Sequence, residues 1–360
     1  MKQNILSLFS LVFISSAMLA QIPANYYNNA AGLNGDALRL ALFNIIKNHN
    51  TQSYSSLWNH FGTTDKQPNS NYIWDIYSDN PNGANPYNHT YNSDQCGNYN
   101  AENVCYNREH SMPKSWFHDI SPMRTDLFHL YPTDGYVNGR RSNNSYGEVS
   151  SASWTSQNGS KLGTCNYPGY STSFPNSKVF EPIDEYKGDL ARSYFYMLTR
   201  YRFRQFYQDG NNHNDMVVGN GGTNVCQFTP WAQNMLLEWA ANDPVSQKEI
   251  DRNNRIYQIQ GNRNPYIDHP EWPAMVWGPF ASIDNYKNLL TKAWYANNQL
   301  HINGEIKQAT NVVIYNMLGE IVNIHKISNN NSTFNVQLPK GVYLVTIEGK
   351  LSNTLKFVVG

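Results

Sequence analysis

Residues 106–113 read Tyr-Asn-Arg-Glu-His-Ser-Met-Pro, and residues 126–143 read Asp-Leu-Phe-His-Leu-Tyr-Pro-Thr-Asp-Gly-Tyr-Val-Asn-Gly-Arg-Arg-Ser-Asn. Together they set an adjacent carboxylate and imidazole, Glu109 and His110, ahead of an amide, Asn138. Glutamate and asparagine offer hard oxygen ligands of the kind that Mg²⁺ takes, and a histidine beside them can take a proton from an attacking water. These residue types therefore predict metal-assisted hydrolysis of a phosphodiester.

Two arginines, Arg140 and Arg141, follow the amide closely and are within reach of phosphate oxygens bound at the same ion. Adjacent residues of a strand point to opposite faces, so Glu109 and His110 serve one site only if their strand ends or twists there. Pro113 comes three residues after His110 and is consistent with such an end.

The composition is that of a secreted globular protein. Of the 360 residues, 40% are hydrophobic and only 15% charged, enough for a large domain and a small one. The net charge is zero, and residues 21–290 hold 20 Lys and Arg against 24 Asp and Glu, a net charge of −4. This balance argues against a DNA-packaging protein but not against a hydrolase that must release its product.

The N-terminus resembles a secretory signal peptide over residues 1–20, because one lysine precedes an uncharged, apolar stretch that ends in small residues. No later apolar run reaches the length of about 18 residues that a membrane span needs.

Export permits disulfides, and the chain has four cysteines without a Cys-x-x-Cys pair, which disfavours a structural zinc site. Cys96 and Cys105 bracket eight residues immediately before the Glu-His pair, and we predict a disulfide between them. Cys165 and Cys226 form the remaining candidate pair.

Apolar periodicity predicts four helices in the first 280 residues. Turn residues dominate residues 142–178, and short loops and brief strands are expected over residues 60–108. The predicted helices are Asp36–His49, Pro182 to about Phe206, Trp231–Ala241, and a helix from Asp243 to about Gln260.

From about residue 295 the sequence pattern changes to short runs rich in β-branched residues at nearly regular spacing. This pattern predicts a small all-β sandwich. The expected fold class is α+β: a signal peptide (1–20), a mainly helical catalytic domain (21–281), a linker (282–294) and a β-sandwich domain (295–360). The expected strands are 298–302, 311–317, 321–325, 334–338, 342–347 and 355–359.

Five ordered segments lie between residues 30 and 275: Asn107-Arg-Glu-His-Ser-Met-Pro, Asp126-Leu-Phe-His-Leu-Tyr-Pro, Gly135-Tyr-Val-Asn-Gly-Arg-Arg-Ser-Asn, Asp189-Leu-Ala-Arg-Ser-Tyr-Phe-Tyr-Met and Ile259-Gln-Gly-Asn-Arg-Asn-Pro-Tyr-Ile. Together they resemble the bacterial endonuclease I family of secreted, nonspecific nucleases. Two later runs, Val313-Ile-Tyr-Asn-Met-Leu-Gly-Glu and Lys340-Gly-Val-Tyr-Leu-Val, look like the C-terminal sorting domain of type IX secretion cargo.

The resemblance implies an embedded ββα-metal (His-Me finger) motif, in which Glu109 and Asn138 bind one divalent ion and His110 is the general base. It implies hydrolysis of DNA, with RNA as a second substrate, leaving 5′-phosphate ends; the expected ion is Mg²⁺, with Ca²⁺ and Mn²⁺ as alternatives. The relatives carry an insertion after the Glu-His-x-x-Pro run that supplies a phosphate-binding arginine, and this chain lacks it. Arg141 takes that catalytic role in our prediction.

For several nearby residues, a purely structural role competes with a role in catalysis or substrate binding. Asp126 and His129 are expected to be structural, and Arg108 either reaches phosphate or pairs with Asp126. The run Arg200, Arg202 and Arg204 is expected to be a solvated helix end, with tracking of a nucleic-acid backbone as the alternative.

Two other classes of protein compete with a secreted nuclease. One is a noncatalytic surface adhesin carried by the same tail, and the other is a phosphodiesterase acting on smaller substrates. In all three cases the expected location is secreted or cell-surface after passage through the periplasm, with the type IX machinery as partner and a monomeric state.

Deleting residues 295–360 should leave the nuclease activity of the purified protein within a few-fold of the full chain. The segment offers two isolated histidines, His301 and His325, and no Glu-His pair. In the native host the same deletion should trap the protein inside the outer membrane, which cell fractionation measures. Normal secretion of the truncated chain would contradict the sorting assignment.

Overall fold

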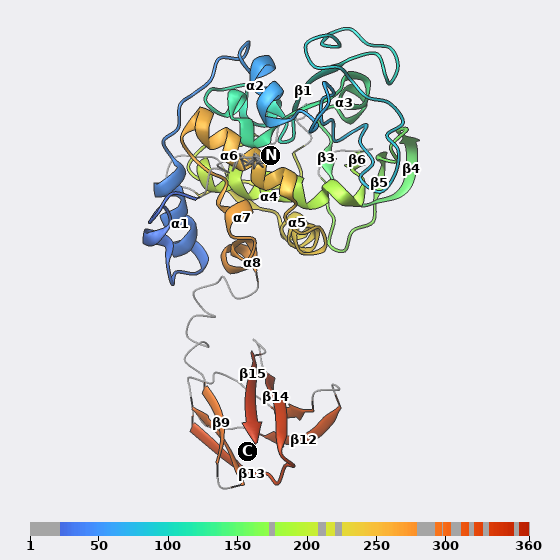
Figure 1. The fold of residues 1–360 in the computed structure, drawn as a ribbon. Coiled ribbons are helices and arrows are strands. Elements are labelled where there is room, and N and C mark those ends of the chain that lie inside the picture. Colours follow the sequence, from blue (N-terminus) through green and yellow to red (C-terminus); the bar gives the residue numbers. More distant parts are fainter. Residues whose placement is uncertain are drawn as a thin grey trace, which may run out of the picture.

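The computed structural model describes residues 22–172, 177–207, 214–219, 225–278, 292–296, 298–303, 311–316, 320–326, 331–348 and 353–359. This part of the chain is mixed α and β, with helices and several small sheets (Figure 1). The predicted signal peptide and residues 282–291 of the predicted linker lie outside it. Among the helices described, none is long and apolar enough to cross a membrane.

An antiparallel hairpin carries the Glu-His pair. Strand β1 (Tyr106–His110) pairs with β2 (Leu130–Asp134), so that the first residue of each strand lies opposite the last residue of the other. Helix α3 (Gly135–Arg141) begins directly after β2, because the Asp134 carboxylate accepts a hydrogen bond from the backbone of Val137 and caps the helix. The order strand, strand, helix is the one predicted for this stretch.

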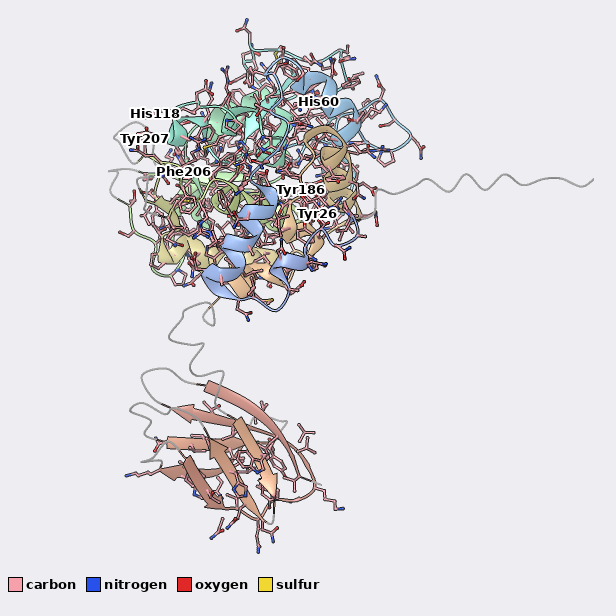
Figure 2. The ribbon with its side chains drawn as sticks, turned by 90° about the vertical axis from the view of Figure 1, so that its left-hand side faces the viewer. Tyr26, His60, His118, Tyr186, Phe206 and Tyr207 are labelled. Atoms are coloured by element: carbon pink, nitrogen blue, oxygen red, sulfur yellow. A yellow bond between two sulfur atoms is a disulfide. The ribbon has the colours of Figure 1, made fainter. Side chains whose placement is uncertain are left out.

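The connection between β1 and β2 is fixed by contacts with a distant segment. Figure 2 labels His118 and Tyr207, whose rings stack with centroids 3.4 Å apart. The backbone N–H of Tyr207 also donates to the carbonyl of Trp116 at 2.8 Å. The connection contains three short 3₁₀ helices, η2 (Lys114–Phe117), η3 (Met123–Thr125) and η4 (Leu127–His129).

The other helices gather around α4 (Lys187–Arg200), which is buried from Lys187 through Thr199 and packs against α1 and α5. Its charged residues tolerate this burial because they are paired, as Lys187 is with Glu181 and Arg192 with Glu249. The remaining helices are η1 (Asn28–Ala30), α1 (Gly35–Ile46), α2 (Leu57–Thr64), η5 (Asp184–Tyr186), α5 (Pro230–Asn242), α6 (Gln247–Gln260), α7 (Pro265–Asp268) and α8 (Trp272–Trp277).

The predicted helices near α1, α5 and α6 are confirmed, with shifted ends. Helix α6 begins at Gln247 because Ser246 and Glu249 form a reciprocal capping box there. The predicted helix from Pro182 to Phe206 is too long at both ends, since a 3₁₀ turn precedes α4 and the helix ends at Arg200. Helix α2 lies partly in the region for which loops and brief strands were expected.

Residues 142–178, in which turn residues dominate, also contain three strands that were not predicted. These residues contribute most of a four-stranded sheet in the order β3–β6–β5–β4, in which β3 and β6 are parallel and the other pairs antiparallel. Its strands are β3 (Ser145–Tyr146), β4 (Val149–Thr155), β5 (Lys161–Cys165) and β6 (Val179–Glu181). A second small pair joins β7 (Val217–Val218) to β8 (Gln227–Phe228).

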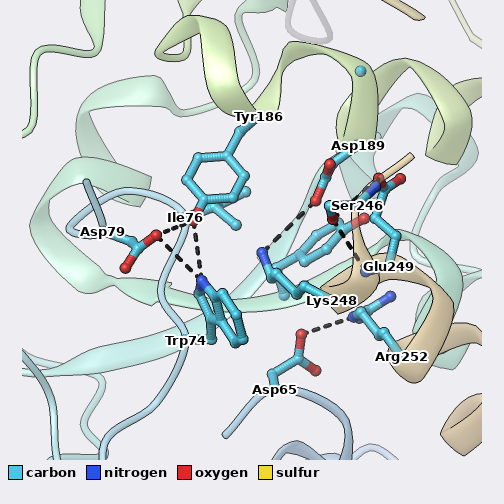
Figure 3. A network of polar contacts seen from close by, with 12 residues as sticks. Asp65, Trp74, Ile76, Asp79, Tyr186, Asp189, Ser246, Lys248, Glu249 and Arg252 are labelled. Carbon is cyan, nitrogen blue, oxygen red and sulfur yellow. Dashed lines mark hydrogen bonds and ion pairs between the residues drawn. The ribbon is translucent and has the colours of Figure 1, made fainter. Parts of the chain in front are cut away.

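Helix α6 is tied to the hairpin by a buried polar network (Figure 3). Arg252 is 2.7 Å from Asp65 and also donates to the carbonyl of Leu130, the first residue of β2, at 2.6 Å. Lys248, one turn earlier, lies 3.7 Å from Asp189 of α4. Removing one partner of a buried pair is costly, so these contacts hold the start of β2 against the helices.

The disulfide between Cys96 and Cys105 is confirmed, and the pairing of Cys165 with Cys226 is wrong. Cys226 is a free, buried thiol beside the Arg39 guanidinium, whereas Cys165 is a half-exposed thiol at the end of β5. The disulfide loop contains Tyr99, whose ring lies against α3. A Cβ on Gly135 would approach that ring to 2.6 Å, so the glycine permits the contact.

The C-terminal region forms two antiparallel sheets, β13–β10–β9 and β12–β11–β14–β15. One hydrophobic cluster takes residues from both sheets, including Leu300 and Val345. Strand β9 begins at Lys292, inside the predicted linker. The strands are β9 (Lys292–Ala296), β10 (Gln299–Asn303), β11 (Asn311–Tyr315), β12 (Ile321–Lys326), β13 (Asn331–Asn335), β14 (Gly341–Glu348) and β15 (Asn353–Val359).

Replacing Cys96 and Cys105 together with serine should lower the free energy of unfolding by roughly 2–3 kcal/mol, the value of closing so short a loop in the chain-entropy model. Denaturant unfolding measures the change. Cys165→Ser is the control, and it should leave the midpoint nearly unchanged because this half-exposed thiol has no disulfide partner. Equal midpoints for the double variant and the control would contradict a bracing role of the disulfide.

Candidate active site

His110 is the last residue of β1, at the end of the strand as predicted. Its Nε2 lies 3.0 Å from the carbonyl oxygen of Arg124. Since a carbonyl only accepts hydrogen bonds, Nε2 carries the proton in the neutral ring and Nδ1 keeps the lone pair. Burial, and then the neighbouring ring of His129, hold the pKa of His110 well below its usual value. The imidazole is therefore neutral at pH 7, with Nδ1 as its basic atom.

Glu109 is only 2% exposed and is held by two donors. The hydroxyl of Tyr77 and Nη1 of Arg141 each lie 3.0 Å from Oε1. Burial raises the pKa of this carboxyl to about 7, and the Arg141 guanidinium opposes the rise. A second cation at this carboxylate would favour the ionised form further.

The two side chains of the Glu-His pair have different neighbours, as the alternation of a strand requires. Glu109 faces Tyr77 and Arg141, whereas the ring of His110 lies near Tyr54, with centroids 6.2 Å apart, and near His129. Arg141 links the two residues, because it bonds to the Glu109 carboxylate and also donates to the backbone carbonyl of His110 at 2.9 Å.

Asn138 lies in α3 and points its amide at β1. Its Nδ2 donates to Oδ1 of Asn107 at 2.6 Å. Within the residues that the structure describes, its Oδ1 accepts no hydrogen bond, so this oxygen is available to a cation. One carboxylate and one amide oxygen are the kinds of ligand that Mg²⁺ prefers. The donor set of Glu109 and Asn138 therefore suits a divalent ion.

The geometry does not fit the predicted role of Arg141 at the scissile phosphate. This side chain is 1% exposed, and its terminal nitrogens donate to Glu109, to the carbonyls of His110 and Ser111, and to the Tyr194 hydroxyl. A guanidinium engaged in this way has no terminal N–H left for a substrate phosphate. Arg141 is instead a positioning residue for the end of β1.

Asp126 and His129 are structural. The Asp126 carboxylate is fully buried and accepts hydrogen bonds from Tyr196 and Tyr201, at 2.8 and 2.9 Å. His129 binds the carbonyl of Met123 through Nε2 at 2.6 Å. Among the described residues, Arg108 bonds to the carbonyl of Tyr54 and not to Asp126.

The prediction that Arg200, Arg202 and Arg204 form a solvated helix end is only partly correct. Arg204 is exposed, but Arg202 is buried and pairs with Asp36 at 2.9 Å. Arg200 donates to the ring of His49 at 3.2 Å.

Sequence reasoning missed the tyrosines around the site. Tyr77 bonds to both Glu109 and the Tyr146 hydroxyl, the latter at 2.9 Å, and the ring of Tyr146 lies 4.5 Å from the Arg141 guanidinium carbon. The guanidinium groups of Arg108 and Arg124 both pack on the ring of Tyr54, with their Cζ atoms 3.7 and 4.3 Å from its centroid. Among 25 tyrosines, no local pattern distinguishes these three.

The hairpin and the helix that follows it carry a carboxylate, a neutral imidazole and an amide, which are residue types of a phosphodiester-cleaving enzyme, and the class that they indicate is that of the nucleases. The endonuclease I family model matches residues 34–271, more than half of the chain, so this protein belongs to the endonuclease I family. A second model, the secretion system C-terminal sorting domain, matches residues 296–360. The resemblances to both families are confirmed, and the chain is a secreted or cell-surface nuclease.

The similar proteins include extracellular ribonucleases and a periplasmic deoxyribonuclease. The extracellular ribonuclease of Bacillus subtilis (strain 168) is 36% identical over 259 residues, covering 70% of this chain and 78% of the relative. The extracellular ribonuclease of Bacillus amyloliquefaciens is 33% identical over 254 residues, with the same coverage of 70% and 78%. The periplasmic deoxyribonuclease of Aeromonas hydrophila is 27% identical over 151 residues, covering 42% of this chain and 50% of the relative.

Arg141→Ala should destabilise the protein by about 3–5 kcal/mol, because it leaves the Glu109 carboxylate buried without its counter-ion. Thermal unfolding measures the loss. Its sequence neighbour Arg140 is the matched control: it is partly exposed and lies 5.4 Å from the Trp154 ring, so Arg140→Ala should cost little. An Arg141→Ala protein that melts like wild type but cleaves poorly would restore the phosphate role.

Proposed function

We propose that this protein is an endonuclease that hydrolyses phosphodiester bonds of DNA, and also of RNA, with one divalent ion held by Glu109 and Asn138 and with His110 as the general base. The observation that carries the proposal is the hydrogen bond from Nε2 of His110 to the carbonyl of Arg124, which leaves Nδ1 as the basic atom of a neutral ring. The expected ion is Mg²⁺, with Ca²⁺ and Mn²⁺ as alternatives.

In the proposed reaction Nδ1 of His110 takes a proton from water as its oxygen forms a bond to phosphorus. The bond from phosphorus to the 3′-oxygen breaks, this oxygen takes a proton from solvent, and the products are a 5′-phosphate and a 3′-hydroxyl. When bound, a divalent ion polarises the phosphoryl oxygen and stabilises the charge on the leaving oxygen. Arg141 keeps Glu109 and the backbone of His110 in place while this occurs.

The choice between DNA and RNA rests on the relatives, two of which are named ribonucleases and one a deoxyribonuclease. A phosphodiesterase acting on small substrates is separated by comparing supercoiled plasmid with small phosphodiesters. A noncatalytic adhesin would cleave neither. A plasmid-nicking assay with Mg²⁺, Ca²⁺, Mn²⁺ and EDTA tests the proposal, and absence of cleavage with every ion would overturn it.

His110→Ala should reduce plasmid cleavage by about 10²–10⁴-fold, the contribution of a positioned base, without changing the thermal midpoint by more than a few degrees. His60→Ala is the control, because His60 bonds to Gln52 rather than to the hairpin. Wild-type turnover by His110→Ala would contradict the assignment.

Glu109→Gln and Asn138→Ala should instead weaken binding of the ion, because each removes or neutralises one oxygen ligand. Titration calorimetry of the purified variants with Mg²⁺ measures this directly. The glutamine is nearly isosteric and still accepts from Tyr77, so the fold should persist. Unchanged ion affinity in both variants would place the ion elsewhere.

A further inference from the structure

A pocket of about 420 Å³ opens beside the candidate active site. Its wall includes Asn107, whose Oδ1 accepts the hydrogen bond from Asn138, and Arg108, the residue directly before Glu109. The complete lining is Tyr54, Trp58, Gln95, Cys96, Gly97, Asn107 and Arg108. The pocket is thus continuous in sequence with the site but contains none of Glu109, His110, Asn138 and Arg141.

Arg108 is held flat in this pocket by two aromatic rings. Its Cζ lies 3.7 Å from the ring centroid of Tyr54 and 4.3 Å from that of Trp58, and its Nη1 donates to the carbonyl of Tyr54 at 2.8 Å. Stacking orients a guanidinium, and the edge of a stacked guanidinium matches the oxygens of a phosphate. In the described part of the chain its Nε and Nη2 have no acceptor.

Within the part of the chain that the structure describes, no carboxylate compensates the charge of Arg108. Most other arginines of the catalytic domain have carboxylate partners, as Arg192 has Glu249 and Arg263 has Asp268. Among the described residues Arg108 contacts no carboxylate, and the other cation over the Tyr54 ring, Arg124, has Asp119 as its own partner at 3.3 Å. A half-buried cation in such surroundings favours the binding of an anion.

The position of Arg108 on β1 indicates which anion the pocket binds. Arg108 and His110 both contact Tyr54, so they lie on one face of the strand, about 7 Å apart along it. That step is comparable to the distance between successive phosphates of a nucleic-acid strand. The scissile phosphate must lie near Nδ1 of His110, and the next phosphate of the same strand then lies near Arg108.

We propose that the pocket formed by Tyr54, Trp58 and Arg108 is a subsite for the backbone phosphate that flanks the scissile one. The inference rests on the proposed function, since the substrate must be a nucleic-acid strand. It accounts for recognition without sequence preference, because a phosphate carries no base identity. It also fits a catalytic region whose net charge offers no general attraction for DNA.

The test is the salt dependence of binding of a short, fluorescently labelled single-stranded oligonucleotide in EDTA. All proteins are the mature full chain with His110→Ala, so that cleavage does not interfere. Adding Arg108→Gln should weaken binding and reduce the slope of log K against log salt concentration by about 0.7, the loss of one phosphate contact. Arg255→Gln is the control, because this exposed arginine of α6 bonds only to Gln258 in the described structure.

A second pair of variants adds charge without removing the stacked arginine. A Cβ on Gly97 meets nothing within 4 Å, so a side chain fits at this position of the pocket wall. Gly97→Glu should weaken binding and lower the slope as Arg108→Gln does, whereas Gly97→Gln, of equal size but neutral, should bind like its parent. This pair keeps the test valid if Arg108→Gln folds poorly.

An unchanged slope in both Arg108→Gln and Gly97→Glu would overturn the subsite. Weaker binding with an unchanged slope would also overturn it, because that result indicates base stacking or a local structural change. Failure of the proposed function has a different signature. In that case the wild-type protein cleaves neither DNA nor RNA with any ion, whatever the binding slopes are.

Discussion

The buried guanidinium of Arg141 is the contact on which the candidate site depends. It comes from the last turn of α3 and reaches back to β1, where it bonds to the Glu109 carboxylate and to the carbonyls of His110 and Ser111. Those two carbonyls lie where β1 ends and its ladder with β2 stops, and backbone groups at such a place need other partners. One side chain therefore completes the strand end and supplies the counter-ion of the carboxylate beside it.

This arrangement also places the amide of α3. Because Arg141 fixes the end of the helix to β1, Asn138 one turn earlier faces the same strand and bonds to Asn107. The start of the helix is fixed independently by the Asp134 cap and by Tyr99 from the disulfide loop. If Asn138 binds an ion as proposed, its place on a helix held at both ends means that little reorganisation is needed.

The elements with a strong local signal were predictable. Helix α1 buries Leu38, Leu42 and Ile46 on one face, and the spacing of these residues alone identifies it. Strand β4 could not be found in this way, because most of its side chains are exposed and its serines and alanine show no apolar alternation. Helix α4 was extended too far because buried aromatic residues, Tyr186 and Tyr201, also lie directly before and after it, so burial does not mark its ends.

The same limit applies to the site. Glu109, His110 and Asn138 could be selected as candidates from the sequence, because few structural roles need this combination of residue types in one short stretch. Their roles remain predictions. The function of Arg141 was not readable, since a phosphate-binding arginine and a buried structural one look alike in a sequence and differ only in what surrounds them. The partners that decide it, Glu109 and Tyr194, are 32 and 53 residues away along the chain.

Many of the arginines are paired with carboxylates, so the number of arginines overstates the positive charge that a nucleic acid meets at the surface. Arg141, Arg192, Arg202, Arg252 and Arg263 are neutralised by Glu109, Glu249, Asp36, Asp65 and Asp268 respectively. These cations hold the fold together, so they add little to the field outside the protein. Attraction for a polyanion must then come from single unpaired cations close to the chemistry, and Arg108 is one of them. An enzyme built in this way binds its substrate where cleavage occurs and keeps little general affinity for the product, because the salt-dependent part of its binding is confined to a few phosphates.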